Sequence, residues 1–266
     1  MSRNFELLQR AMANGQNVRE SAPGPTPVET AQTTTVPMTR NFSTLAFPSV
    51  TGLTTGNRIE RMRAEEVRKL VQRAFLFPGA PRSVVFAATE QENVSCSWLC
   101  ASASEVLAAH VAGTVCIVDA NRRIPSLHAH CGVENHLGLS DCVENDGPIT
   151  LFTQQVRDNL YLMPAGTNTA EWPTVLTSPR MHTRIAELRK SFDHVMFYAP
   201  PVGRFPDAML LGQLADGIIL IIEADNTKRQ EAKRAKETIE SANVRLLGAV
   251  LDNRKFPIPE AIYRYL

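Results

Sequence analysis

The chain has 266 residues, of which 44% are hydrophobic and 21% charged, as in soluble globular proteins of one or two domains. Its formal net charge of +1 provides no strong basic field to attract nucleic acid, so no nucleic-acid partner is expected. No apolar run is long enough to span a bilayer, and the first residues lack the apolar core of a secretory leader. We therefore expect a cytoplasmic protein.

The N-terminal part of the chain is predicted to lie outside the folded domain. Residues 1–14 form a predicted amphipathic helix, because Phe5, Leu8 and Met12 share one helical face. This helix is either a frayed terminus or a docking segment for a partner or a membrane interface. Residues 15–57 are rich in Pro, Thr, Ser and Asn, which predicts a disordered linker unable to bury enough apolar surface to fold.

Residues 58–266 alternate between helical and strand patterns and are predicted to form one folded domain. Apolar residues at helical spacing predict helices over 58–77, 97–112, 178–192, 207–214 and 227–241, with a short helix opening at 138–141 and a short terminal helix over 259–266. Apolar runs predict strands over 84–88, 115–118, 159–163, 195–197, 217–222 and 246–251. Apolar strands alternating with helices are typical of a doubly wound α/β fold, whose mostly parallel sheet has helices on both faces. Ligands of such sheets bind at the carboxyl ends of the strands, where the turns after residues 88, 118 and 197 should meet.

Cysteines and histidines give no clear metal site. The five cysteines, which we expect to be reduced and mostly buried, are Cys96, Cys100, Cys116, Cys131 and Cys142. They include no Cys-x-x-Cys pair, so no metal is expected there. His128, His130 and His136 lie close enough in sequence for a zinc cluster to be conceivable, but solvated loop histidines are the favoured alternative.

Several segments of the domain match, in order, the motifs of one family. They are IVDANRRIPSLH (117–128) with GLSD (138–141), LYLMPAG (160–166), FDHVMFYAPPV (192–202), DAMLLGQLADGIILII (207–222) and LLGAVLDN (246–253). From about residue 65 to residue 251 the chain thereby resembles the bacterial tyrosine autokinases of exopolysaccharide synthesis, the CpsD/CapB-like group of the MinD/ParA class. The resemblance implies a P-loop NTPase-like fold and, in the family, an ATP-dependent protein-tyrosine kinase that uses Mg²⁺.

The phosphate loop of this class has the pattern Gly-x-x-x-x-Gly-Lys-(Ser/Thr), whose backbone N–H groups and lysine bind the phosphates. The corresponding degenerate loop here is Asn93, Val94, Ser95, Cys96, Ser97 and Trp98. Cys96 stands at the lysine position, while Asn93 and Ser95 stand at glycine positions. Only Ser97, at the Mg²⁺-binding hydroxyl position, is retained. No lysine occurs between residues 69 and 190, so no other register supplies one.

The acid positions of the family are also altered. The remnant acid turn comprises Asp119, Asn121, Arg122 and Arg123, and the third acid site comprises Tyr198, Pro200 and Pro201. The resemblance implies acids where this chain has Asn121 and Tyr198. Asp119 is retained, and it would either hold Mg²⁺ together with Ser97, if Mg²⁺ binds at all, or cap a turn. Trp98 and Tyr198 are expected to fill part of the space that phosphates and metal would occupy.

Other family features are partly present. Candidate residues on the base side of a nucleotide are Asp252 and Asn253, and candidate phospho-acceptors are Tyr263 and Tyr265. Glu65 and Arg68 match the family's oligomer segment, but Val71 and Arg73 replace its later Arg and Asn. A homo-oligomer built on this helix is therefore an open alternative.

Loss of the lysine and two acids predicts a catalytically impaired protein, because phosphoryl transfer depends on positioning and charge neutralisation. The resemblance then implies a regulatory or structural partner in exopolysaccharide synthesis or export, held by a protein partner such as a membrane-anchored activator at the inner face of the plasma membrane. No cofactor is expected beyond weak binding of ATP or ADP and Mg²⁺. Two alternatives stay open: an active tyrosine kinase or ATPase with displaced ligands, and a MinD/ParA-like positioning protein that uses its N-terminal helix.

Overall fold

The computed structural model describes residues 58–90, 94–167 and 172–253 of the chain. The predicted N-terminal helix, the linker over 15–57, and the predicted terminal helix over 259–266 with Tyr263 and Tyr265 lie outside the described residues, as does Asn93 of the phosphate loop. None of the described helices combines the length and the apolar character needed to cross a bilayer.

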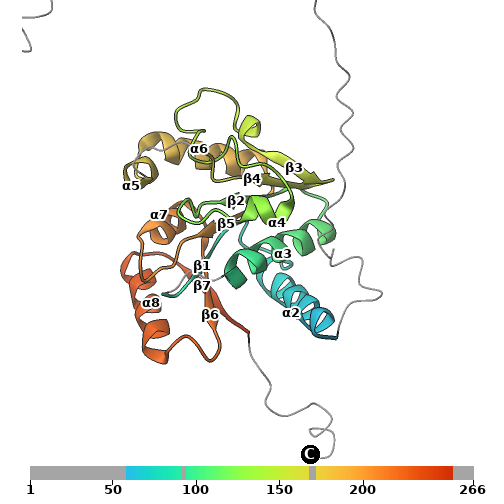
Figure 1. Ribbon diagram of the computed structural model, residues 1–266, viewed down its shortest axis with the longest axis vertical. Coiled ribbons are helices and arrows are strands. Elements are labelled where there is room, and N and C mark those ends of the chain that lie inside the picture. The colour runs from blue at the N-terminus through green and yellow to red at the C-terminus, as the bar shows by residue number, and fades with distance from the viewer. Residues whose placement is uncertain (1–57, 91–93, 168–171, 254–266) are drawn as a thin grey trace, which may run out of the picture. The chain divides into compact units, whose positions relative to one another are not determined.

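A seven-stranded sheet forms the centre of the fold (Figure 1). Its strands are β1 (Ser83–Ala88), β2 (Val115–Asp119), β3 (Gln154–Arg157), β4 (Leu160–Met163), β5 (His194–Ala199), β6 (Gly217–Glu223) and β7 (Leu246–Asp252). The spatial order is β3-β4-β2-β5-β1-β6-β7, and every neighbouring pair is parallel except β3 with β4. The predicted, mostly parallel sheet is therefore confirmed.

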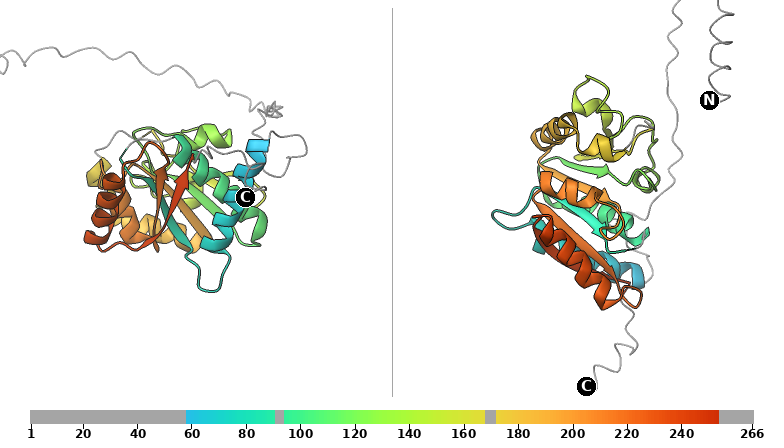
Figure 2. Two further views of the ribbon diagram at one scale, coloured as in Figure 1. Left: turned by 90° about the horizontal axis from the view of Figure 1, so that it is seen from below. Right: turned by 90° about the vertical axis from the view of Figure 1, so that its left-hand side faces the viewer.

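Helices cover both faces of the sheet, as Figure 2 shows. They are α2 (Arg58–Phe75), α3 (Val94–His110), α4 (Leu127–Cys131), α5 (Trp172–Leu176), α6 (Pro179–Ser191), α7 (Asp207–Leu214) and α8 (Arg229–Ser241), with a 3-10 turn η2 (Ile149–Phe152). Residues of α2, α3 and α4 share one buried apolar cluster, and residues of α5 to α8 share the other. Because both faces are covered, β1 and β2 are buried at every residue, which explains why they are apolar except for Ser83 at the start of β1 and Asp119 at the end of β2.

The long predicted elements agree with the structure to within three residues, whereas short ones do not. Helix α3 begins at Val94, three residues before its predicted start. The sequence analysis did not predict α4, α5, β3 or η2, each of which has four or five residues.

The short helix predicted at 138–141 is wrong, because these residues form turns. One carboxylate oxygen of Asp141 accepts hydrogen bonds from the backbone N–H groups of Gly138 (3.0 Å) and Thr167 (3.2 Å), which ties the turn to the chain after β4. A Cβ atom added to Gly138 would lie 2.0 Å from the carbonyl oxygen of Pro164, so this close approach requires glycine.

Arg184 of α6 holds the segment that follows this turn. Its guanidinium donates to the carbonyl oxygens of Cys142 (2.7 Å) and Gly147 (2.9 Å), and also to that of Asn145. The side chain is nearly buried and pairs with Glu187 one turn along the helix. A single side chain therefore satisfies three carbonyl groups of a segment that has no regular structure.

Candidate functional site at the carboxyl edge of the sheet

The carboxyl ends of β1, β2 and β5 lie side by side, as the sequence predicts. Asp119 at the end of β2 is in register with Tyr198 of β5, and Tyr198 is in register with Phe86 of β1. The turns after these strands and the start of α3 therefore share one edge of the sheet, where ligands of parallel α/β sheets bind.

Asn121 and Tyr198, which stand where the family resemblance implies acids, contact each other. The Asn121 side-chain amide donates to the Tyr198 hydroxyl at 3.0 Å, and its carbonyl oxygen accepts from the backbone N–H of Ile124 at 3.3 Å. Both side chains are buried. An amide and a phenol thus form a neutral pair at this point of the edge.

Asp119 caps the short helix α4. One carboxylate oxygen accepts from the backbone N–H groups of Ser126 and Leu127, both at 2.9 Å, and the other accepts from Asn121 N–H at 3.2 Å. A carboxylate at a helix N-terminus binds N–H groups that have no partner within the helix, and its charge is favourable there. The structure therefore shows the turn-capping contact that was one of the two sequence interpretations of Asp119.

The retained hydroxyl of Ser97 contacts a histidine that sequence analysis placed elsewhere. Ser97 Oγ lies 3.0 Å from Nε2 of His130, which α4 brings against the first turn of α3. Burial, with a smaller contribution from neighbouring His128, lowers the pKa of His130, so the imidazole is neutral at neutral pH. The favoured prediction of solvated loop histidines is wrong for His128 and His130, which lie half-buried in helix α4. His136 is exposed, and among the described residues no group of three potential ligands fits a metal ion.

The thiol at the lysine position is buried. Cys96 and Cys100 are both inaccessible to solvent on α3, and Cys131 of α4 is half-buried. Burial raises the pKa of Cys100 well above its ordinary value and that of Cys131 to about 12, which keeps both as neutral thiols. This agrees with the prediction of mostly buried, reduced cysteines.

The aromatic and basic residues of the edge are engaged by neighbouring elements. Trp98 is half-buried, with the guanidinium carbon of Arg63 5.8 Å from its ring centroid. Arg123 Nη1 lies 2.6 Å from a carboxylate oxygen of buried Asp207 at the start of α7, and its guanidinium carbon lies 3.8 Å from the Phe205 ring centroid. The contacts of Arg123 are thus those of a residue that joins β2 to α7.

Ser95 of the predicted loop and Asn253 of the predicted base side come together. The side-chain Nδ2 of Asn253 lies 3.2 Å from Ser95 Oγ and 3.3 Å from an Oε of Glu223. Arg63 donates to the side-chain Oδ1 of Asn253 at 3.2 Å. The sequence therefore identified two residues of one polar cluster, which joins α2, α3, β6 and the end of β7.

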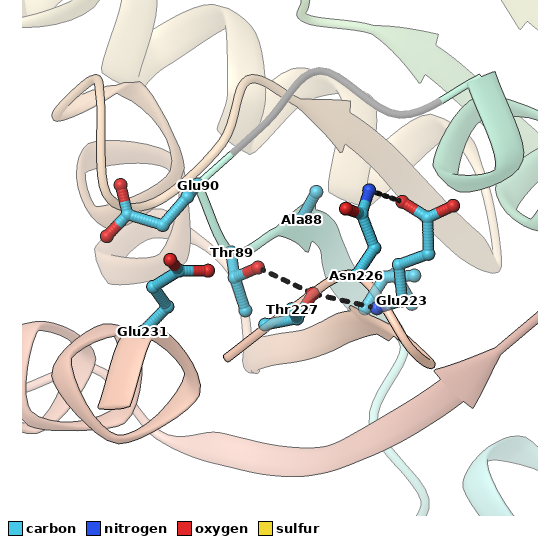
Figure 3. A pocket seen from close by; sticks show the side chains of 8 residues that line it. Ala88, Thr89, Glu90, Glu223, Asn226, Thr227 and Glu231 are labelled. Carbon is cyan, nitrogen blue, oxygen red and sulfur yellow. Dashed lines mark hydrogen bonds between the residues drawn. The ribbon is translucent and has the colours of Figure 1, made fainter. Parts of the chain in front are cut away.

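A small pocket beside the end of β1 adds residues that the sequence analysis did not select. Its lining comprises Ala88, Thr89, Glu90, Ile221, Glu223, Asn226, Thr227 and Glu231. Figure 3 shows Thr89 and Thr227 at its centre, between Glu231 on one side and Glu223 on the other; the two threonine hydroxyls are 3.5 Å apart. Three carboxylates around one pocket disfavour an anionic ligand such as a triphosphate. Sequence patterns do not predict this group of carboxylates, because its members come from three separate segments that only the fold brings together.

Comparison with known proteins shows which proteins this chain is similar to. No family model matches the chain. The tyrosine-protein kinase YwqD of Bacillus subtilis is 30% identical over 145 residues, which is 53% of this chain and 60% of YwqD. The candidate tyrosine-protein kinase CapB of Staphylococcus aureus is 26% identical over 200 residues, 71% of this chain and 88% of CapB. The tyrosine-protein kinase CpsD of Streptococcus agalactiae is 28% identical over 93 residues, 35% of this chain and 40% of CpsD.

The chain is a relative of the CpsD/CapB-like bacterial tyrosine kinases. This CpsD/CapB-like chain spans only part of YwqD and CpsD, but most of CapB.

Solved structures agree with that family at the level of the fold. The chimerical protein CapA2B2 has a TM-score of 0.69 at 22% identity, covering 78% of this chain and 90% of that one. The kinase domain of Escherichia coli ETK has a TM-score of 0.64 at 18% identity, with coverage of 74% and 79%. A ParA-family ATPase from Chlorobium tepidum has a TM-score of 0.55 at 14% identity, with coverage of 65% and 74%. The fold of the CpsD/CapB-like chain is therefore the P-loop NTPase-like fold of the MinD/ParA class.

Proposed function

We propose that this CpsD/CapB-like chain is a catalytically impaired relative of the tyrosine autokinases, and that it acts by protein contact as a regulatory or structural partner in exopolysaccharide synthesis or export. The observation that most supports the proposal is the buried hydrogen bond between Asn121 and Tyr198, 3.0 Å long. It joins an amide and a phenol at two positions where the resemblance implies carboxylates. Neither group carries the charge that would order Mg²⁺.

The surrounding contacts support the same conclusion. Cys96 offers a buried thiol in place of the ammonium that would neutralise phosphate charge. The hydroxyl of Ser97 contacts His130, and the carboxylate of Asp119 accepts backbone N–H groups of α4. Loss of one stabilising group at a transition state commonly lowers the rate by about 10²–10³-fold, and several are altered here. ATP turnover should therefore be very low.

Nucleotide binding by the purified full chain tests this proposal. We expect millimolar ATP, with or without Mg²⁺, to leave the melting temperature unchanged, because ligand binding to the native state would raise it. Phosphate release should not exceed that of a Ser97→Ala variant. A melting shift together with release that Ser97→Ala abolishes would instead assign the chain to the active kinases or ATPases.

The proposed partner is a protein of the polysaccharide machinery, with a membrane-anchored activator as the first candidate. This part of the proposal rests on the resemblance to the tyrosine autokinases. Fractionation of cells that contain the chain tests it, since contact with such an activator should place the chain in the membrane fraction. Recovery of the chain in the soluble fraction, whether or not the activator is present, would contradict this partner.

A further inference from the structure

The two edges of the sheet differ in character. At one edge, β3 has four residues with the sequence QQVR, which is short and polar. At the other edge, β7 has seven residues with the sequence LLGAVLD, and among the described residues it pairs only with β6. It contains neither the lysine nor the proline that usually protects an edge strand from pairing. A largely apolar edge of this length is available for pairing with another strand.

An apolar groove runs along β7. It lies between Leu70 in the second half of α2 and Phe77 just after that helix on one side, and the β7 residues Leu247, Val250 and Leu251 on the other. Phe77 is 48% exposed and Leu251 is 54% exposed, although both are large and apolar. Exposed apolar surface that is continuous with a sheet edge is typical of a docking site for a polypeptide.

The backbone of β7 shows which residues face the open side. The carbonyl oxygen of Asp252 accepts the backbone N–H of Ala224, which follows β6, at 2.8 Å. Successive residues of a strand direct their N–H and C=O groups to opposite edges. Leu251 and Ala249 therefore direct theirs away from β6, toward the open edge.

We propose that residues 254–266 of the same chain, instead of forming the predicted helix over 259–266, turn back after Asn253 and pair antiparallel with β7, with Ile258 opposite Leu251 and Glu260 opposite Ala249. Asn253 already has the left-handed conformation, with φ of 56°, that commonly begins a reversal of the chain. The segment starts where β7 ends, and its 13 residues reach about 43 Å when extended, against about 23 Å for the seven residues of β7.

The prolines of the segment fit this arrangement. Pro257 and Pro259 are two residues apart, so in an extended strand both lack an N–H group on the same edge. The opposite edge, which belongs to Ile258 and Glu260, keeps its N–H groups for pairing with β7. The proline edge then faces solvent and blocks the addition of another strand. Residues that precede proline also favour extended conformations, which applies to Phe256 and Ile258.

Covalent continuity favours this occupant over a separate molecule. A short tether gives an effective concentration in the millimolar range, above that of a second copy in dilute solution. Charge opposes this pairing, because the groove is lined by Lys69, Arg73 and Arg245 against Glu66, and the segment itself has three basic residues and one acid. Backbone hydrogen bonds and apolar contacts would therefore provide the binding energy, and high salt should not release the segment.

Hydrogen exchange of the β7 amides in the full chain tests the proposal. We expect exchange within residues 246–252 to become about tenfold faster, or more, when the chain is ended after Asn253. Glu260→Pro removes an N–H group that faces β7 and should have the same effect. Ala261→Pro is the matched control, because it adds a proline to the edge that already has two. Unchanged exchange in β1 shows that each variant is folded.

Three results would overturn the proposal. The first is equal β7 exchange in the full and shortened chains, or equal exchange in Glu260→Pro and Ala261→Pro. The second is protection of β7 that rises with protein concentration together with a doubled mass in light scattering, which would assign the edge to a second copy. The third is β7 protection that is lost when residues 1–57 are removed but is unchanged when the chain is ended after Asn253. That result would assign the edge to the N-terminal segment. The proposal does not depend on nucleotide binding, so failure of either proposal leaves the other standing.

Discussion

At the scale of single residues, the candidate site is a set of polar side chains that bind one another. Asn121 contacts Tyr198, Ser97 contacts His130, and Asp119 accepts backbone N–H groups. Buried polar groups with such partners rigidify a structure, whereas a ligand site needs groups that can exchange partners. The chemistry of this edge therefore changes only if these pairs are broken.

Restoring the acids and the lysine should restore affinity for nucleotide. In a Cys96→Lys, Asn121→Asp, Tyr198→Asp variant we expect calorimetry to detect Mg-ATP binding that the parent chain lacks at the same millimolar concentration, because three charges are then added for phosphate and metal. The matched control is Cys96→Met, Asn121→Ser, Tyr198→Phe, which breaks the same contacts without adding charge. Equal gains in both variants would show that removal of the pairs, and not charge, opens the site.

His130 should make the protein less stable in acid. Burial lowers the pKa of His130 in the folded state, so below the ordinary histidine value of about 6.5 the unfolded chain binds more protons than the folded chain. The stability that the folded state gains from keeping His130 neutral is fully present above that pH. It is lost as the pH falls toward the lowered folded-state pKa. The free energy of unfolding, measured in urea at pH 7.5 and at pH 5.5, should be lower at pH 5.5.

His130→Gln should reduce this loss of stability in acid, while part of it persists because burial also lowers the pKa of His194. His136→Gln is the control, since His136 is exposed and lies in a loop. Equal pH dependence in all three proteins would contradict the proposed burial of neutral His130.

At the scale of elements, the sequence predicted what is periodic and failed where order depends on contacts distant in sequence. Helices and strands with a clear period were placed to within three residues, and the meeting of Asp119 with Tyr198 follows from any parallel sheet with this strand order. Helix α4 has only five residues, too few for a detectable period. The contact of His130 with Ser97 depends on α4, so it was missed together with that helix. The turn at 138–141 is likewise held by a distant N–H group of Thr167.

Arg184 provides a stability test of such long-range order. Arg184→Met should lower the free energy of unfolding by about 2–4 kcal/mol, because three carbonyl groups lose their donor at a nearly buried site. Arg180→Met, on the same helix, removes an exposed pair with Asp146 and should cost less than about 1 kcal/mol. Equal losses in a denaturant titration would mean that the carbonyl contacts contribute little.

At the scale of the whole molecule, the question is whether the chain assembles with itself. Glu65 and Arg68, which match the family's oligomer segment, bond to each other across one turn of α2 at 3.1 Å, and both are exposed. A pair already satisfied within one helix gives little reason for contact with a second copy. We expect light scattering at micromolar concentration to give the mass of one chain, 29.4 kDa, unchanged by Arg68→Ala. A larger mass that Arg68→Ala reduces would show assembly through this helix.

The capping of α4 by Asp119 has one more consequence. A divalent cation that bound the carboxylate oxygen used by α4 would have to displace the backbone N–H groups of Ser126 and Leu127. The first turn of α4 would then unwind, and His130 would leave Ser97 with it. Cation binding and unwinding of α4 would therefore occur in one cooperative transition. The free energy needed to unwind the helix would set the cation concentration required.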